Sequence, residues 1–135
     1  MSGAADSPSP ALVEACAVQQ RAAAVGFDWP DVTGVLAKVR EETAEIEHAL
    51  AASDPQHAKR ELGDLLFSAV NLARFLDADA TQELRRATAR FQCRFARVER
   101  EIERSGRSMT ACSLEELDAV WERVKGDLSA HEEGA

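Results

Sequence analysis

Two acidic patterns in the first half of the chain have the residue types that bind divalent cations. Glu41, Glu42 and Glu45 form the first pattern, and Glu61 with Asp64 forms the second. On a helix, at about 100° per residue, the three glutamates of the first pattern share one arc. Because Lys38 lies in the same arc, the simplest interpretation of this segment alone is a solvated face with an ordinary Lys–Glu pair.

The second acidic pattern is harder to explain as a solvated surface. Glu61 and Asp64 share a strip with the few polar residues of a segment that is mostly apolar over 65–76. Carboxylates beside a buried surface are costly unless they are paired or bind a cation. They therefore either form salt bridges, with Lys59, Arg60 or the downstream arginines, or hold a metal ion.

A short break at 53–55 separates the two acidic segments, and antiparallel packing across it would bring their acidic strips together. Four or five carboxylates would then converge, although like charges repel. A cluster made only of oxygen ligands selects hard divalent cations such as Mg²⁺ or Mn²⁺. We therefore expect a metal site, provided that the two segments face each other.

A basic segment follows the acidic ones. Residues 85–107 contain eight of the sixteen Lys and Arg residues and have a net charge of +5, whereas residues 41–64 have −5. Arg90 and Arg94 lie beside an apolar stripe, where they could reach a polyanion held by the metal. Alternatively, they form a solvated basic face or simple ion pairs with the acidic strip. A cation combined with arginines suits phosphoryl chemistry, and no Gly-rich phosphate-binding loop is present in the sequence.

Trp121 and Lys125 are further candidates near the end of the chain. They lie one helical turn apart, so the ring could stack on a base while the ammonium group adds a positive charge. A tryptophan on an apolar helical stripe is more often part of a core, and that alternative stays open.

Helices are expected to position all these residues. Of the hydrophobic residues 25 are Ala and only 12 are Val or Ile, and the chain has no Tyr, which favours an all-α bundle of four to five helices. The helix over 56–76 is apolar around most of its circumference, so we expect it to be buried on most sides. Capping residues and breakers predict helices at 9–25, from 28 or 31 to 52, and at 56–76, 79–106 and 113–128.

The length of the chain predicts one helical domain over 9–128, between flexible tails at 1–8 and 129–135. So few helices cannot cover every apolar face, which favours a homodimer or a higher homo-oligomer. A net charge of −8 argues against a nucleic-acid partner. The absence of a membrane-spanning run and of a signal sequence predicts a cytoplasmic protein. Three cysteines without C-x-x-C spacing suggest neither a disulfide framework nor a zinc site.

The motifs occur in an order that resembles one known family. Glu-Glu-x-x-Glu at 41–45 and Glu-Leu-Gly-Asp-Leu-Leu-Phe at 61–67 follow Gly-Phe-Asp-Trp-Pro at 26–30, and further matches lie at 70–74, 90–95 and 117–125. Over residues 12–128 the chain resembles the MazG-type all-α nucleoside triphosphate pyrophosphohydrolases, in particular the second module of the longer members. The resemblance implies Mg²⁺-dependent hydrolysis, with Mn²⁺ as a substitute, between the α and β phosphates of a nucleoside triphosphate. The implied products are a nucleoside monophosphate and pyrophosphate. The implied role of the reaction is nucleotide-pool control or house-cleaning.

The same resemblance implies roles for individual residues. The Mg²⁺ ligands would be Glu42, Glu45, Glu61 and Asp64, with Glu41 in the same cluster, where it would place the attacking water. Nucleotide contacts would come from Lys38, Arg90, Arg94, Trp121 and Lys125, joined by Lys59 and Arg60. Arg90 stands where the family usually has Lys, which keeps the charge but changes the donor geometry and bears on substrate preference.

Three other functions remain open from the sequence. Phosphoribosyl-ATP pyrophosphohydrolases have a related fold and use related chemistry. A di-iron carboxylate bundle would use two Glu-x-x-His pairs, of which Glu45 and His48 supply one, but Glu61 with Asp64 stands at the second position. A non-catalytic helical interaction module would use the charged strips only to pair with each other.

Overall fold

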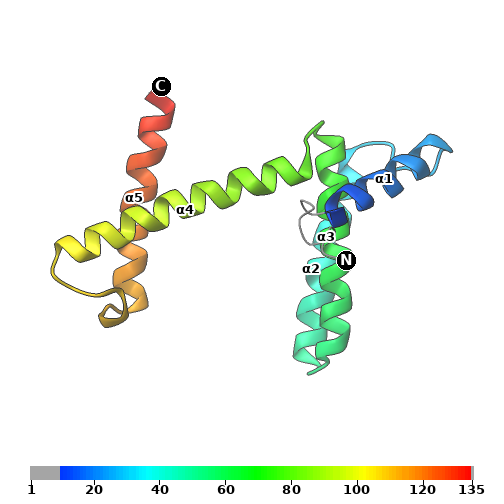
Figure 1. The fold of residues 1–135 in the computed structure, drawn as a ribbon. Helices are drawn as coiled ribbons and strands as arrows, with labels where there is room; N and C mark the ends of the chain where they lie inside the picture. The colour runs from blue at the N-terminus through cyan, green and yellow to red at the C-terminus, as the bar shows by residue number, and fades with distance from the viewer. Residues whose placement is uncertain (1–9, 135) are drawn as a thin grey trace, which may run out of the picture. The chain divides into compact units, whose positions relative to one another are not determined.

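The computed structural model describes residues 10–134, which form helices and connecting turns with no strand among them. The all-α prediction is therefore confirmed. The tail expected at 1–8 lies outside the described residues. Figure 1 shows the elements in chain order. They are α1 (Pro10–Ala24), α2 (Val32–Ala51), α3 (Pro55–Phe75), α4 (Ala80–Arg104), a short 3-10 helix η2 (Met109–Ala111) and α5 (Leu114–Gly134).

The chain divides into two compact units, with the boundary after Glu83 near the start of α4. The first unit contains α1, α2, α3 and the first residues of α4, and the second contains the rest of α4 together with η2 and α5. The expectation of a single domain over 9–128 stays a prediction. No helix in the part of the chain described is long and apolar enough to cross a membrane.

The first unit is built around a hairpin of α2 and α3, which lie side by side (Figure 1). Asp31 begins α2 by accepting a hydrogen bond from the backbone N–H of Thr33 at 2.9 Å, and Asp54 begins α3 by accepting one from His57 at 3.2 Å. These caps satisfy backbone donors that a helix start leaves free. The short connection between the two helices makes them antiparallel neighbours, as the sequence predicted.

The segment between α1 and α2 is anchored to both helices of the hairpin. Arg74 on α3 donates to Asp28 at 2.6 Å, and its Nε also donates to the side chain of Asn71 at 3.0 Å. The ring of Trp29 lies directly against Gly34 of α2, where an added Cβ would come within 2.5 Å of the ring atom Cε3. A glycine in the first turns of α2 is therefore required by this close approach rather than by its backbone angles.

The prediction that α3 is buried on most sides is wrong for the single chain. Only Ser68 and Val70 of this helix are buried, whereas Leu62, Leu66 and Phe67 are 46 to 55% exposed. The physical reason is the small number of neighbours, since only α2 and α1 pack extensively against α3. A single chain of this length cannot cover an apolar helix on every side.

The second unit has a core of its own between α4 and α5. Val98 and Ile102 of α4 pack with Val124 of α5, and six partly buried side chains, including Leu117 and Trp121, surround them. A capping box starts α5, because the Ser113 hydroxyl accepts from the Glu116 N–H while the Glu116 carboxylate accepts from the Ser113 N–H. The helix continues to Gly134, past its expected end, since the intervening residues include neither Pro nor Gly.

Candidate metal centre and active site

Three carboxylates from α2 and α3 meet across the helix hairpin. Glu42 of α2 and Glu61 and Asp64 of α3 each offer one oxygen atom, and these oxygens all lie within 4.8 Å of one another. Glu42 is only 4% exposed, and the side chain of Glu61 is 13% exposed, while Asp64 is open to solvent. The antiparallel hairpin explains this convergence, because Glu61 and Asp64 lie one turn apart on the face of α3 that meets α2.

The electrostatics of this cluster indicate a site that lacks positive charge. The neighbouring carboxyl group of Glu61, followed by Lys38, lowers the pKa of Glu42. The carboxyl group of Glu42 in turn raises the pKa of Glu61, together with burial and the charges of Glu42 and Asp64. Two carboxyl groups in such contact need a shared proton or a cation between them.

An unsatisfied oxygen points to the cation. Nζ of Lys38 lies 3.0 Å from Oε1 of Glu42, but Oε2 of Glu42 is buried and has no hydrogen-bond partner in the part of the chain that the structure describes. A buried carboxylate oxygen without a partner is costly, and an ion bound among the three acidic side chains would satisfy it. The donor set consists only of carboxylates, which fits Mg²⁺ or Mn²⁺. The residues present therefore fit a hard divalent cation.

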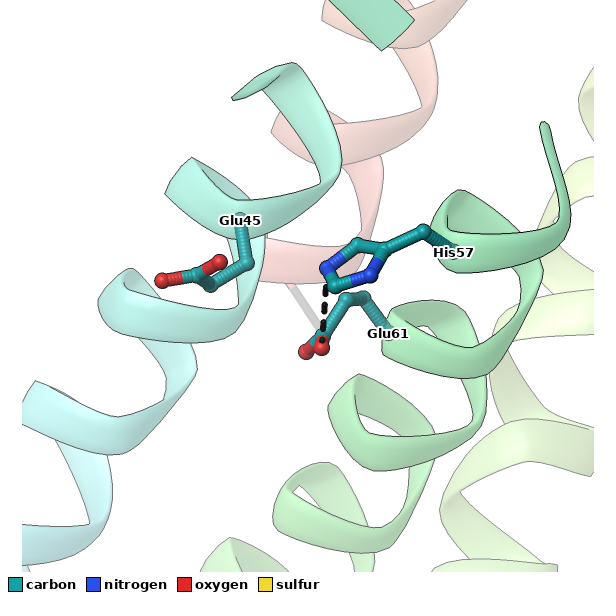
Figure 2. A group of neighbouring side chains, drawn as sticks. All are labelled: Glu45, His57 and Glu61. Carbon is teal, nitrogen blue, oxygen red and sulfur yellow. Dashed lines mark ion pairs between the residues drawn. The ribbon is translucent and has the colours of Figure 1, made fainter. Parts of the chain in front are cut away.

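A second group of ligands adjoins the first and includes a histidine. Glu45 of α2 and His57 and Glu61 of α3 each offer one ligand atom within 4.8 Å of the other two (Figure 2). Nε2 of His57 lies 3.4 Å from Oε1 of Glu61. His57 is not among the residues expected from the sequence, although its position one turn before Glu61 places both side chains on the same face of the helix. Glu61 belongs to both groups.

Three other site residues expected in the first unit are exposed and lie outside both groups of ligands. Glu41 is exposed and pairs with Lys38 at 3.5 Å, and it belongs to neither group of ligands. Lys59 and Arg60 are exposed, and no ion pair involves them among the side chains described, those of residues 10–128. They therefore do not neutralise the acidic strip. His48 is also in neither group, so the geometry gives no support to the di-iron arrangement.

The remaining expected residues belong to the second unit. Arg90 and Arg94 lie on α4, and Trp121 and Lys125 lie on α5. The Trp121 ring contacts the Phe91 ring, with 5.2 Å between ring centroids, and packs against the core of this unit. Trp121 is thus partly buried, whereas Arg90 and Lys125 are exposed to solvent.

The fold and the acidic cluster define a helical protein with a candidate divalent-cation site, and comparison with known proteins gives its family. Residues 30–99, which contain both groups of ligands, match the MazG nucleotide pyrophosphohydrolase domain. The chain belongs to this family.

Relatives with assigned names agree with the family match. The chain is 45% identical, over 117 residues, to a protein of Thermotoga maritima named nucleoside triphosphate pyrophosphohydrolase/pyrophosphatase MazG. It is 43% identical, over 118 residues, to the nucleoside triphosphate pyrophosphohydrolase of Escherichia coli K12. These alignments cover 87% and 86% of this chain but 45% of each relative, so the chain spans less than half the length of these relatives.

Proposed function

We propose that this chain hydrolyses nucleoside triphosphates between the α and β phosphates and releases a nucleoside monophosphate and pyrophosphate. The observation that carries the proposal is the meeting of Glu42, Glu61 and Asp64, together with a buried oxygen of Glu42 that has no hydrogen-bond partner among the described residues. Membership of the MazG family and the names of the two relatives support the reaction. We further propose that the reaction serves nucleotide-pool control or house-cleaning.

In this proposal Glu42, Glu45, Glu61 and Asp64 hold Mg²⁺, which Mn²⁺ can replace. When bound, such a cation polarises phosphate oxygens and lowers the charge that an incoming nucleophile meets. The neighbouring carboxyl group of Glu61, followed by the ammonium group of Lys38 at 3.0 Å, holds the pKa of Glu42 below its usual value. The ionised carboxylate is the form that binds a metal ion.

The attacking water would be oriented by Glu41, whose carboxylate is exposed beside Lys38. As the water oxygen bonds to the α phosphorus, its proton passes to the Glu41 carboxylate and the bond from the α phosphorus to the bridging oxygen breaks. Pyrophosphate leaves with the electron pair of that bond. Guanidinium and ammonium groups stabilise the charge that develops on the leaving group.

Nucleotide-binding residues are proposed separately within each unit. In the first unit, Lys38, Lys59 and Arg60 would contact the nucleotide, and the last two are exposed without an ion pair among the described residues. In the second unit the residues proposed to bind the nucleotide are Arg90, Arg94, Trp121 and Lys125. If they bind substrate, replacing Arg90 or Trp121 with Ala should raise KM more than it lowers kcat.

We also propose that the protein acts as a homodimer or a higher homo-oligomer. Leu62 and Leu66 lie one turn apart on α3 and are 48% and 55% exposed, which leaves an apolar face on the central helix of the first unit. A second copy of the chain would cover it. Leu66→Glu should then shift the sedimentation coefficient toward that of a monomer, whereas Leu114→Glu, at an exposed leucine on α5, should leave it unchanged.

The reaction is tested by incubating the chain with canonical and modified nucleoside triphosphates and with phosphoribosyl-ATP in the presence of Mg²⁺. We expect one pyrophosphate for each nucleotide consumed, and no orthophosphate as the direct product. Preferential hydrolysis of phosphoribosyl-ATP would assign the alternative activity instead. Stabilisation by Mg²⁺ without hydrolysis of any substrate would indicate a non-catalytic module.

A further inference from the structure

An imidazole group lies among the carboxylates of the helix hairpin. His57 is in the first turn of α3, where its backbone N–H donates to the capping side chain of Asp54 at 3.2 Å. Figure 2 shows the ring extending from α3 toward α2, with Glu61 on the next turn and Glu45 on the opposite helix. The side chain of His57 is 41% exposed, so a metal ion can reach it from solvent.

A simple ion pair does not account for this arrangement. His57 and Glu61 are one turn apart on the same helix, and such a pair forms readily on any helix surface. Glu45, however, comes from α2 and brings a carboxylate oxygen within 4.8 Å of the ligand atoms of both residues. Two acidic side chains and one imidazole, supplied by two helices, form a mixed oxygen and nitrogen donor set.

The two adjoining groups of ligands differ in the metals that they favour. Glu42, Glu61 and Asp64 offer only oxygen, which suits Mg²⁺ and Mn²⁺. Imidazole nitrogen favours Zn²⁺, Co²⁺ and other later transition metals, for which carboxylates also serve as ligands. Three protein ligands are also the usual number at an open zinc site, in which a further position is left for water or another ligand.

We propose that Glu45, His57 and Glu61 form a second cation subsite, which takes a transition-metal ion of the Zn²⁺ class in preference to Mg²⁺. The inhibitory consequence rests on the proposed function, because Glu45 and Glu61 are also proposed ligands of the Mg²⁺ that supports hydrolysis. An ion held by His57 withdraws these two carboxylates from Mg²⁺. Zn²⁺ therefore inhibits the Mg²⁺-dependent reaction, and the inhibition depends on His57.

Metal binding by the full chain tests the subsite without reference to activity. Zn²⁺ affinity is measured by competition with a chromophoric chelator, and Mg²⁺ affinity by titration calorimetry. We expect His57→Gln to weaken Zn²⁺ binding by about tenfold or more and to leave Mg²⁺ binding unchanged. His48→Gln is the matched control, because His48 is an exposed histidine on α2 that belongs to neither group of ligands. It should bind both metals as the unchanged chain does.

A second variant replaces one metal ligand with another. His57→Cys should restore tight Zn²⁺ binding, and with Co²⁺ as the probe it should show a thiolate-to-cobalt charge-transfer band that the unchanged chain and His57→Gln lack. Far-ultraviolet circular dichroism checks that each variant keeps its helices. A merely structural role of His57 would not produce this band.

The outcomes separate the subsite from the proposed function. Zn²⁺ binding that is equally tight in His57→Gln overturns the subsite, even if the chain hydrolyses nucleotides. Zn²⁺ binding that depends on His57 supports the subsite, even if no nucleotide is hydrolysed and the proposed function fails. If the chain is active, inhibition by Zn²⁺ that is as strong in His57→Gln as in the unchanged chain overturns the inhibitory consequence.

Discussion

Nζ of Lys38 lies 3.0 Å from one carboxylate oxygen of Glu42, one turn further along α2, while the other oxygen of Glu42 is buried without a partner among the described side chains. Lys38 therefore neutralises only part of the acidic cluster that Glu42 forms with Glu61 and Asp64. The remaining negative charge of these three carboxylates favours binding of a divalent cation among them.

Replacing Lys38 should show that the stability of the acidic cluster depends on positive charge. Without Mg²⁺, Lys38→Met leaves the Glu42 carboxylate buried without the ammonium group that pairs with it. This should lower the free energy of unfolding by about 1–3 kcal/mol. Mg²⁺ should then raise the melting temperature of this variant more than that of the unchanged chain. Lys59→Met, at an exposed lysine without an ion pair in the described residues, is the control and should change stability little. Equal stability of both variants would contradict the role given to Lys38.

Mg²⁺ binding should stabilise the fold through Asp64. A ligand that binds only the folded state stabilises it by about 2.7 kcal/mol when its concentration is a hundred times Kd. Asp64→Asn should remove most of this stabilisation, measured as the shift in Tm on adding Mg²⁺, while Glu47→Gln on the exposed surface of α2 should retain it. An undiminished shift in Asp64→Asn would remove Asp64 from the metal site.

The capping box of α5 predicts a dependence of stability on pH. The ion pair with Arg107, followed by hydrogen bonds from Ser113, lowers the pKa of Glu116 from 4.5 to about 2. A carboxyl group whose pKa is lower in the folded state contributes stability above its unfolded pKa, and this contribution is lost as the pH falls from 4.5 toward 2. Glu116→Gln can still cap the helix but cannot ionise.

Chemical denaturation should therefore show Glu116→Gln to be less stable than the unchanged chain near neutral pH. The difference in unfolding free energy between this variant and the unchanged chain should disappear as the pH falls from 4.5 toward 2. Glu115→Gln, at the neighbouring exposed glutamate, controls for the loss of one negative charge. A difference that stays constant down to the lowest pH would show that ionisation of Glu116 contributes nothing.

Two glycines in helices should respond to alanine in opposite ways. At Gly34 an added Cβ would lie 2.5 Å from the Trp29 ring, so Gly34→Ala should displace the ring and destabilise the chain by about 1–3 kcal/mol. At Gly63 an added Cβ would meet no described atom within 4 Å beyond its chain neighbours and the backbone of α3 itself, so Gly63→Ala should stabilise α3 by about 0.5–1 kcal/mol through helix propensity. Tryptophan fluorescence in a Trp121→Phe background would report the displacement. An unchanged spectrum in Gly34→Ala would contradict the packing.

Local signals explain why much of the fold could be predicted. Asp31, Asp54, Asp79 and Ser113 each accept a hydrogen bond from a backbone N–H in the first turn of a helix, so the starts of α2, α3, α4 and α5 depend on a few adjacent residues. The convergence of the carboxylates followed from the same information, because a short connection leaves two helices antiparallel. The chemical roles of these residues stay predictions.

Other features depend on contacts between distant residues and could not be read from local patterns. Burial of α3 depends on how many neighbours cover it, and the apolar pattern alone overestimated that number. His57 was missed because Glu45, which completes its group of ligands, comes from the other helix of the hairpin. The η2 turn at Met109–Ala111 has no side-chain cap that could mark its start.

The central proposal is that the carboxylates of α2 and α3 bind a divalent cation for cleavage between the α and β phosphates. The most direct test measures pyrophosphate released per nucleoside triphosphate consumed, with and without Mg²⁺, in the unchanged chain and in Asp64→Asn. We predict a ratio of one that requires Mg²⁺, and loss of turnover in the variant. Orthophosphate as the first product, or undiminished turnover in Asp64→Asn, would contradict the claim.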